Sequence, residues 1–241
     1  MSLTSQVLHS GEPHGASESS KLNWLRAGVL GANDGIVSTA LLLLSVIAAG
    51  SSKSAILTAG AAAVIAGAIS MALGEYVSVS TQRDTERALI AKEKAELRDF
   101  PEEEHAELVD ILAGYGIPEK VAEDAARGIE SNNPLSAHLR LELGIDGEDL
   151  TNPWAAALSS AVSFICGAIF PLAVALIFSN GNAGAIAVTV VTLVALALTG
   201  FVSAKLSETH SGRAAVRLVI GGALGLAVSY GVGAIFGAAV A

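Results

Sequence analysis

Five long apolar runs constrain the fold of this chain more than any other feature. They cover residues 27–49, 55–77, 154–178, 183–206 and 214–240 of the 241-residue sequence. About 20 residues in an α-helix cross the hydrocarbon core of a bilayer. No run alternates between apolar and polar residues over ten positions, which disfavours a membrane β-barrel. The sequence therefore predicts an all-α integral membrane protein with five transmembrane helices per subunit.

A charged insert separates the second run from the third. Residues 83–149 hold 18 acidic and 8 basic residues, a net charge of −10, against −9 for the whole chain. Prolines and glycines divide the insert into short helices: Asp99 is the predicted N-cap of one, Pro118 opens another, and Gly144 ends the last. The predicted domains are a disordered tail (1–21), spans one and two (22–82), an acidic helical domain (83–149) and spans three to five (150–241).

Basic residues in the short loops predict the orientation. Lys21 and Arg26 precede the first run, and Lys205 and Arg213 flank the link between the fourth and fifth, whereas the link between the first and second carries only Lys53. The N-terminus and the insert are therefore expected in the cytosol. No cleavable signal peptide is expected, because residues 1–21 lack an apolar core. The resident membrane would be the plasma membrane in a bacterium and the vacuolar membrane in a eukaryote.

Two acids lie inside the first two apolar runs. Asp34 is the eighth residue of the first run, and Glu75 lies near the end of the second, four residues after Met71 and so on the same helical face. A carboxylate at the centre of a membrane helix costs roughly 2.5–3.5 kcal/mol, and such residues commonly carry ions or protons. Two carboxylates and a thioether suit Fe²⁺ or Mn²⁺, and the carboxylates could take up protons when the metal leaves.

Two of these three residues have simpler explanations. The carboxylate of Glu75 could extend to the membrane interface, and Met71 could serve only in packing. Glycines at seven-residue intervals in the second run, Gly60, Gly67 and Gly74, predict a close contact with another helix. The spacing leaves open whether that helix belongs to the same chain or to a second copy.

Carboxylates also gather in the insert. Glu93 and Glu96 are three residues apart, as are Glu104 and Glu107 on the next predicted helix, so each pair shares a helical face. If the two helices pack against each other, the four carboxylates repel one another unless a cation lies between them. The alternative is a solvated acidic surface. Further donors close in sequence are Glu103, His105, His138 and Glu142.

The sequence resembles the vacuolar iron transporter family over residues 22–240. The first run contains Gly31-Ala32-Asn33-Asp34-Gly35, and the second contains Ser70-Met71-Ala72-Leu73-Gly74-Glu75-Tyr76-Val77-Ser78. The charged insert and the element Glu142-Leu143-Gly144 at its end also match the family.

The resemblance implies a function and its site residues. It implies a homodimer that moves Fe²⁺ or Mn²⁺ out of the cytosol in exchange for protons, along a path lined by the first spans. Asp34, Met71 and Glu75 fall on family positions tied to that path. The resemblance also implies that the insert binds metal through glutamates at spacings of 3, 8 and 3, which Glu93, Glu96, Glu104 and Glu107 reproduce.

One departure from the family concerns the insert. Where iron-transporting members carry a methionine pair before the Glu-Leu-Gly element, this chain has His138 and Leu139. Here an imidazole, close in sequence to Glu142, stands in place of sulfur. The site could therefore bind Mn²⁺, Zn²⁺ or Co²⁺ as well as Fe²⁺. No other cofactor and no nucleic acid partner is expected, because the chain has neither a phosphate-binding loop nor a basic patch.

Two other functions compete with transport. A regulatory membrane protein could sense metal through the insert without moving it. A di-iron ferroxidase would need two Glu-x-x-His elements, and the insert offers only Glu102-x-x-His105. An enzyme is therefore the least favoured reading of the sequence.

Overall fold

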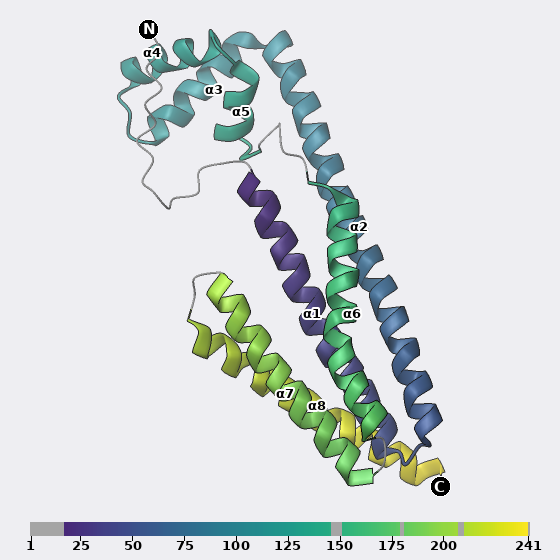
Figure 1. Cartoon of the computed structure of the whole chain (residues 1–241). Coiled ribbons are helices and arrows are strands. Elements are labelled where there is room, and N and C mark those ends of the chain that lie inside the picture. The colour runs from purple at the N-terminus through teal and green to yellow at the C-terminus, as the bar shows by residue number, and fades with distance from the viewer. Residues whose placement is uncertain (1–16, 146–150, 179–180, 207–209, 241) are drawn as a thin grey trace. The chain divides into compact units, whose positions relative to one another are not determined.

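The computed structural model describes residues 17–145, 151–178, 181–206 and 210–240, and every regular element in these ranges is a helix (Figure 1). Five of the helices are long and apolar enough to cross a membrane, which confirms the predicted all-α membrane fold. These five are α1, α2, α6, α7 and α8. The bounds are α1 (Ser17–Ala48), α2 (Lys53–Asp99), α3 (Pro101–Gly114), α4 (Glu119–Glu130), α5 (Pro134–Leu141), α6 (Pro153–Ile177), α7 (Gly181–Leu206) and α8 (Ser211–Val240).

The chain forms two compact units. The membrane unit comprises residues 23–77 and 153–241, and the insert unit comprises mainly residues 78–152. Helix α1 begins at Ser17, inside the segment predicted as a disordered tail, because no proline or glycine interrupts the helix before Gly28. Residues 1–16 and the predicted boundary at 149 lie outside the described residues, so the domain limits stay predictions.

Glycines bring the helices of the membrane unit close together. A Cβ atom on Gly31 of α1 would lie 2.6 Å from the carbonyl oxygen of Ser160 in α6, and one on Gly167 of α6 would collide with the Ala32 carbonyl of α1. Gly233 of α8 approaches the backbone of α1 in the same way. Such contacts suit a bilayer, where van der Waals packing must replace the hydrophobic effect between helices.

Two of the three evenly spaced glycines in α2 contact helices of the same chain rather than requiring a second copy. Gly60 faces Leu43 and Leu172, and Gly67 faces the ring of Phe164, all in the same chain. Gly74 has open space around it. The seven-residue period therefore marks a packing face within the subunit, and that face does not extend to Gly74.

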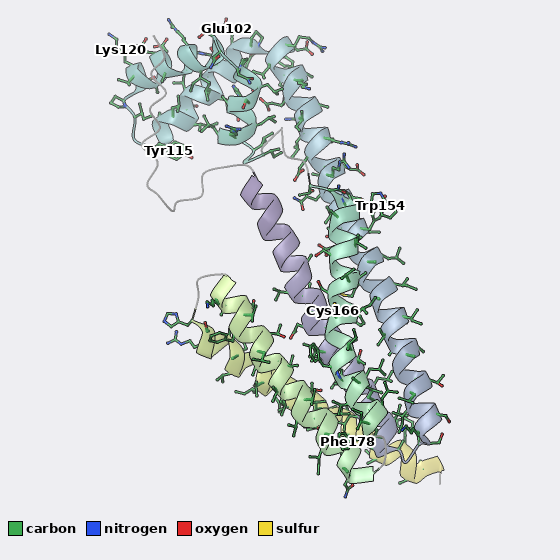
Figure 2. All side chains as sticks on the ribbon, viewed as in Figure 1. Glu102, Tyr115, Lys120, Trp154, Cys166 and Phe178 are labelled. Atoms are coloured by element: carbon green, nitrogen blue, oxygen red, sulfur yellow. The ribbon has the colours of Figure 1, made fainter. Side chains whose placement is uncertain are left out.

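The outward faces of the membrane helices are apolar. Large side chains such as Leu73, Ile186 and Phe236 are more than half exposed, a pattern suited to lipid rather than water. Figure 2 shows the contrast, since oxygen and nitrogen atoms crowd the side chains of α3 and α4, whereas those of α6 end mainly in carbon. On α2 a dense series of charged residues begins at Arg83, so the remainder of this helix, through Asp99, is polar and lies beyond its apolar part.

Helix ends in the insert unit largely follow the sequence signals. Helix α3 ends at Gly114, and α4 begins directly after Pro118, as predicted. The predicted N-cap at Asp99 is wrong. Asp99 is the last residue of α2, and its carboxylate accepts a hydrogen bond of 2.7 Å from Arg98, which competes with any capping role. Phe100 takes the N-cap position of α3 without a side-chain hydrogen bond.

A small apolar core holds the insert helices in place. Leu108 and Leu112 of α3 pack against Ala122 and Ala126 of α4, and Leu141 of α5 lies against the same cluster. The two alanines let α3 and α4 approach closely. This packing fixes the direction in which the polar faces of α3 and α5 point, and so positions the site.

Candidate metal centre

Four potential metal ligands converge inside the insert unit. Glu93 comes from the polar end of α2, Glu104 from α3, His138 from α5, and Glu142 from the C-cap position of α5. One ligand atom from each residue lies within 4.8 Å of all the others. The imidazole Nδ1 of His138 lies 3.2 Å from Glu93 Oε1, 3.4 Å from Glu104 Oε2 and 3.6 Å from Glu142 Oε2. We call these four residues the insert cluster.

The insert cluster is buried. His138 is completely inaccessible to solvent, Glu93 is 2% exposed and Glu104 is 7% exposed. Among the described residues, neither ring nitrogen of His138 has a hydrogen-bond partner, nor have the carboxylate oxygens that face it. A buried polar atom left unpaired usually costs about 1–3 kcal/mol, so several at one point call for a compensating ligand.

Local sequence explains how α5 presents two of the four ligands. Asn133 caps the helix, because its side-chain oxygen accepts a hydrogen bond of 3.2 Å from the Ser136 backbone. His138 and Glu142 then lie four residues apart and on one face. Gly144 adopts a left-handed conformation with φ +64°, as its predicted role in helix termination requires. Together the cap and the turn fix the register of both ligands.

Burial and mutual repulsion disfavour charge on the glutamates. Burial, followed by the negative charges of Glu142, Glu104 and Glu96, raises the pKa of Glu93 to about 7. Glu93 lies ten residues beyond Arg83 and so outside the membrane-spanning part of α2. Burial also raises the pKa of Glu104, although nearby His138 opposes that rise. A cation in the cluster would relieve the repulsion and displace a proton near neutral pH.

Two of the predicted glutamates lie outside the cluster. Glu96 pairs with Lys92 at 2.8 Å on the helix surface, and Glu107 is exposed. Both still act on the cluster electrostatically, because Glu96 raises the pKa of Glu93 and Glu107 raises that of Glu104. The structure therefore separates the four predicted glutamates into an inner and an outer pair, which their spacing alone does not indicate.

The second histidine of the insert has a different partner. His105 Nδ1 lies 2.9 Å from Glu130 Oε1 and 3.0 Å from Glu130 Oε2, so one carboxylate occupies this nitrogen. The pair lines a polar pocket of about 530 Å³ that also includes Glu102 and Arg127. Within the described residues, the insert cluster is the one group of three or more such donors close enough to hold a metal ion. Glu102-x-x-His105 thus does not form a second centre.

The predicted residues of the spans are spread over the membrane unit. Asp34 is half-buried on α1, and its backbone carbonyl accepts a hydrogen bond of 2.6 Å from Ser38. Met71 packs against the cluster around Phe164, which supports a packing role. Glu75 is also half-buried and belongs to no group of three donors among the described residues.

An aromatic pair lies beside Glu75. The rings of Tyr76 and Trp154 have their centres 4.7 Å apart. Tyrosine and tryptophan are typical of the membrane–water boundary, so this pair indicates that Glu75 lies near that boundary. The carboxylate could therefore reach the interface, as the simpler explanation of this residue proposed.

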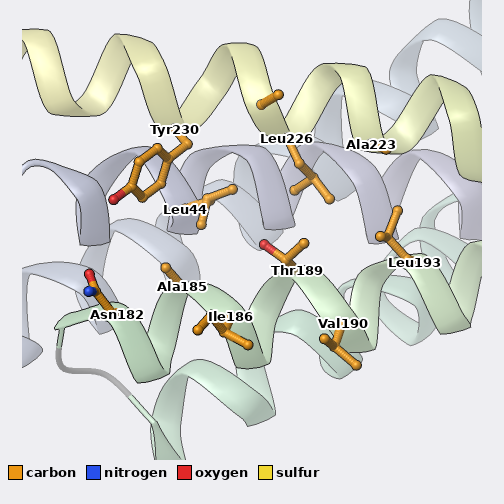
Figure 3. A pocket seen from close by; sticks show the side chains of 11 residues that line it. Leu44, Asn182, Ala185, Ile186, Thr189, Val190, Leu193, Ala223, Leu226 and Tyr230 are labelled. Atoms are coloured by element: carbon orange, nitrogen blue, oxygen red, sulfur yellow. The ribbon is translucent and has the colours of Figure 1, made fainter.

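The membrane unit also contains an apolar groove of about 580 Å³ between α1, α7 and α8. Figure 3 shows Leu44, Leu226 and Val190 along it, with Asn182 and Tyr230 toward one end. None of its eleven lining side chains carries a carboxylate, thiol or imidazole. The groove therefore offers no strong metal ligand, and the chemistry of the described part of the chain concentrates in the insert cluster.

Comparisons with known proteins identify the family of this chain. A family model described as the VIT family matches residues 25–234. A vacuolar iron transporter of Acanthamoeba castellanii is 40% identical over 223 residues, covering 92% of this chain and 82% of the relative. The vacuolar iron transporter homolog 2.1 of Arabidopsis thaliana is 35% identical over 91% of this chain and 84% of its own length. Vacuolar iron transporter 1 of Oryza sativa subsp. japonica is 31% identical over 86% of this chain and 83% of its own length. Such similarity spans both the apolar helices and the insert, and the chain therefore belongs to the VIT family.

Proposed function

We propose that this protein transports divalent first-row metal ions, with Fe²⁺ and Mn²⁺ as the expected cargo, out of the cytosol in exchange for protons. The observation that carries the proposal is the insert cluster, whose buried ligand atoms lack partners, in a chain with five membrane-spanning helices. Relatives that are named as vacuolar iron transporters support the same function.

The insert, residues 83–149 in the predicted domain limits, would take up metal on the cytosolic side. Glu93, Glu104, His138 and Glu142 would hold the ion, since together they offer three carboxylates and an imidazole. The outer pair, Glu96 and Glu107, would attract cations to the cluster without binding the first one directly. This division of roles follows from the burial of the inner residues and the greater exposure of the outer ones.

The path through the membrane would use the acids of the first two spans. Asp34 would bind metal and protons in turn, because a carboxylate inside an apolar helix is costly and such residues commonly mark ion or proton pathways. Glu75, with Met71 on the same helical face, would act where the path meets the membrane boundary. A homodimer with its path between the first spans would complete the pathway, as the family resemblance implies.

The expected orientation places the N-terminus and the insert in the cytosol, because cytosolic loops of membrane proteins carry an excess of lysine and arginine. In a eukaryotic cell the resident membrane would be vacuolar, and in a bacterium it would be the plasma membrane. Zn²⁺ and Co²⁺ are open as further cargo because of the imidazole in the cluster.

Flux into proteoliposomes tests the proposal. Purified protein should move Fe²⁺ or Mn²⁺ faster under a pH gradient than without one, and Asp34→Asn should stop the flux while the variant still folds. Within the insert, Glu104→Gln should slow the flux, whereas Glu103→Gln, which changes an exposed neighbour on α3, should not. Flux that ignores the gradient would argue against proton exchange. Metal binding without any flux would favour the regulatory alternative, which the separate insert unit would also accommodate.

A further inference from the structure

We propose that the insert cluster is a four-coordinate site with His138 Nδ1 as its nitrogen ligand, and that it selects Zn²⁺ and Co²⁺ over Mn²⁺ and Mg²⁺. The inference rests on the proposed function and concerns which divalent ions the insert cluster binds most tightly, namely those that accept imidazole in a tetrahedral shell. It comes from three features of the cluster: the spacing of its donors, the buried His138 ring without a hydrogen-bond partner among the described residues, and the contrast with His105.

The distances from His138 Nδ1 to the three carboxylate oxygens fit a tetrahedral ion. With metal–nitrogen and metal–oxygen bonds of about 2.1 Å, tetrahedral ligands lie about 3.4 Å from one another. Octahedral neighbours at similar bond lengths, as Mg²⁺ demands, lie about 2.9 Å apart. The three distances from His138 Nδ1 are 3.2, 3.4 and 3.6 Å, and so centre on the tetrahedral value.

Hydrogen bonding does not account for the same spacing. A charged imidazole that bound a carboxylate directly would lie about 2.7–2.9 Å from its oxygen. Here Nδ1 faces three carboxylate oxygens at longer distances and makes no hydrogen bond to a described residue. The ring is completely buried, so water does not satisfy it from the surface. One ion at the centre would satisfy Nδ1 and the three oxygens together.

The two histidines of the insert differ in this respect. His105 also lies among acidic residues, yet its Nδ1 is taken by Glu130 at 2.9 Å and the ring is partly exposed. That arrangement is an ordinary ion pair or hydrogen bond. His138 faces three carboxylates at once, and one cation between them would be bound by all four side chains.

The donor set then decides the class of ion. One imidazole and three carboxylates form a borderline set, and affinity at such sites rises from Mn²⁺ through Fe²⁺ and Co²⁺. Mg²⁺ and Ca²⁺ prefer oxygen alone. Zn²⁺ has no electronic preference for six ligands and commonly binds four. An all-oxygen version of the cluster would keep its affinity for Mn²⁺ and lose most of its preference for Zn²⁺.

His138→Asn provides that version, because the asparagine Oδ1 takes the place of Nδ1 in the side chain. Full-length protein in detergent would be titrated with Zn²⁺ and Mn²⁺ separately, against a competing chelator, and the ratio of the two affinities compared between variants. Losing even an outer partner of a metal ligand changes affinity by about 10–100-fold, so the ratio should fall at least about tenfold. His105→Asn is the matched control and should leave the ratio unchanged.

A second measurement needs no variant. Co²⁺ bound to the wild-type protein should show the strong visible absorption of a four-coordinate ion, and excess Zn²⁺ should remove it. Weak absorption typical of six-coordinate Co²⁺ would overturn the tetrahedral assignment, even if His138→Asn fails to fold. An unchanged Zn²⁺ to Mn²⁺ ratio in folded His138→Asn would overturn the assignment of the nitrogen ligand.

The two proposals fail in different ways. If the selectivity ratio is unchanged but the same preparation moves Fe²⁺ or Mn²⁺ into proteoliposomes, this inference is wrong and the proposed function stands. If wild-type protein binds metal with the predicted selectivity but moves none, transport is wrong and the assignment of the site stands.

Discussion

Replacing Glu93 by glutamine should stabilise the metal-free insert while it weakens metal binding. Glu93 is a buried carboxylate whose pKa is raised from 4.5 to about 7 by burial and by its acidic neighbours. Above pH 7 the native insert must hold this group charged in an unfavourable place. Glutamine has nearly the same shape and carries no charge, so Glu93→Gln removes that cost and also removes one metal ligand.

The direction and size of the stability change in Glu93→Gln follow from proton linkage. Between pH 4.5 and about 7 the folded insert binds more protons at Glu93 than the unfolded chain does, so its stability falls as pH rises through this window. A pKa difference of this size corresponds to about 3 kcal/mol, since one pKa unit is about 1.4 kcal/mol. The buried amide of glutamine retains part of the desolvation cost. The gain at pH 8 should therefore be on the order of 1–3 kcal/mol, with little gain at pH 5.

Amide hydrogen exchange in the full-length protein measures this locally. A gain of 1.4 kcal/mol slows exchange through local unfolding about tenfold. With a chelator present, peptides from α3, α5 and the polar end of α2 should therefore exchange about 5- to 150-fold more slowly in Glu93→Gln than in wild type at pH 8. Rates would be corrected for the intrinsic effect of pH. Glu103→Gln, an exposed neighbour of the cluster on α3, should show no such effect.

Adding metal should reverse the order of stability. Wild type should gain protection with Zn²⁺ or Mn²⁺, because an ion that binds only the folded state stabilises it. Glu93→Gln should gain much less. Equal exchange rates of the two metal-free proteins at pH 8 would refute the claim that burial and acidic neighbours disfavour the charged form of Glu93. Equal protection by metal would remove Glu93 from the proposed site.

Three further predictions concern separate parts of the chain. Gly31→Ala should lower the free energy of unfolding in detergent by about 1–3 kcal/mol, because its Cβ would press on α6. Gly74→Ala meets open space and should leave that free energy nearly unchanged. Metal affinity of wild type should weaken as pH falls below about 7, because Glu93 takes up a proton there; calorimetry at pH 6 and pH 8 measures this. Glu142→Gln should reduce metal affinity in the same assay, and a variant with wild-type affinity would remove Glu142 from the cluster.

The sequence alone determined the architecture of this protein. Apolar runs of more than 20 residues must become spanning helices, because every backbone polar group in lipid needs an internal partner. Proline and glycine likewise located most helix ends of the insert, including the left-handed turn at Gly144. The prediction failed at Asp99, where a local pair with Arg98 outweighed its capping preference. Local sequence signals were sufficient for features that depend on one segment of the chain, such as a spanning helix or a helix end.

Only the tertiary structure decided which donors meet. Glutamates at spacings of 3, 8 and 3 looked equivalent in sequence, yet Glu93 and Glu104 turn inward and Glu96 and Glu107 do not. His138 needed α5 to pack beside α2 and α3 before it could face three carboxylates. The pairing of His105 with Glu130, 25 residues away, is invisible to any local pattern. Convergence of this kind depends on long-range packing of the apolar faces, and spacing along one helix does not encode it.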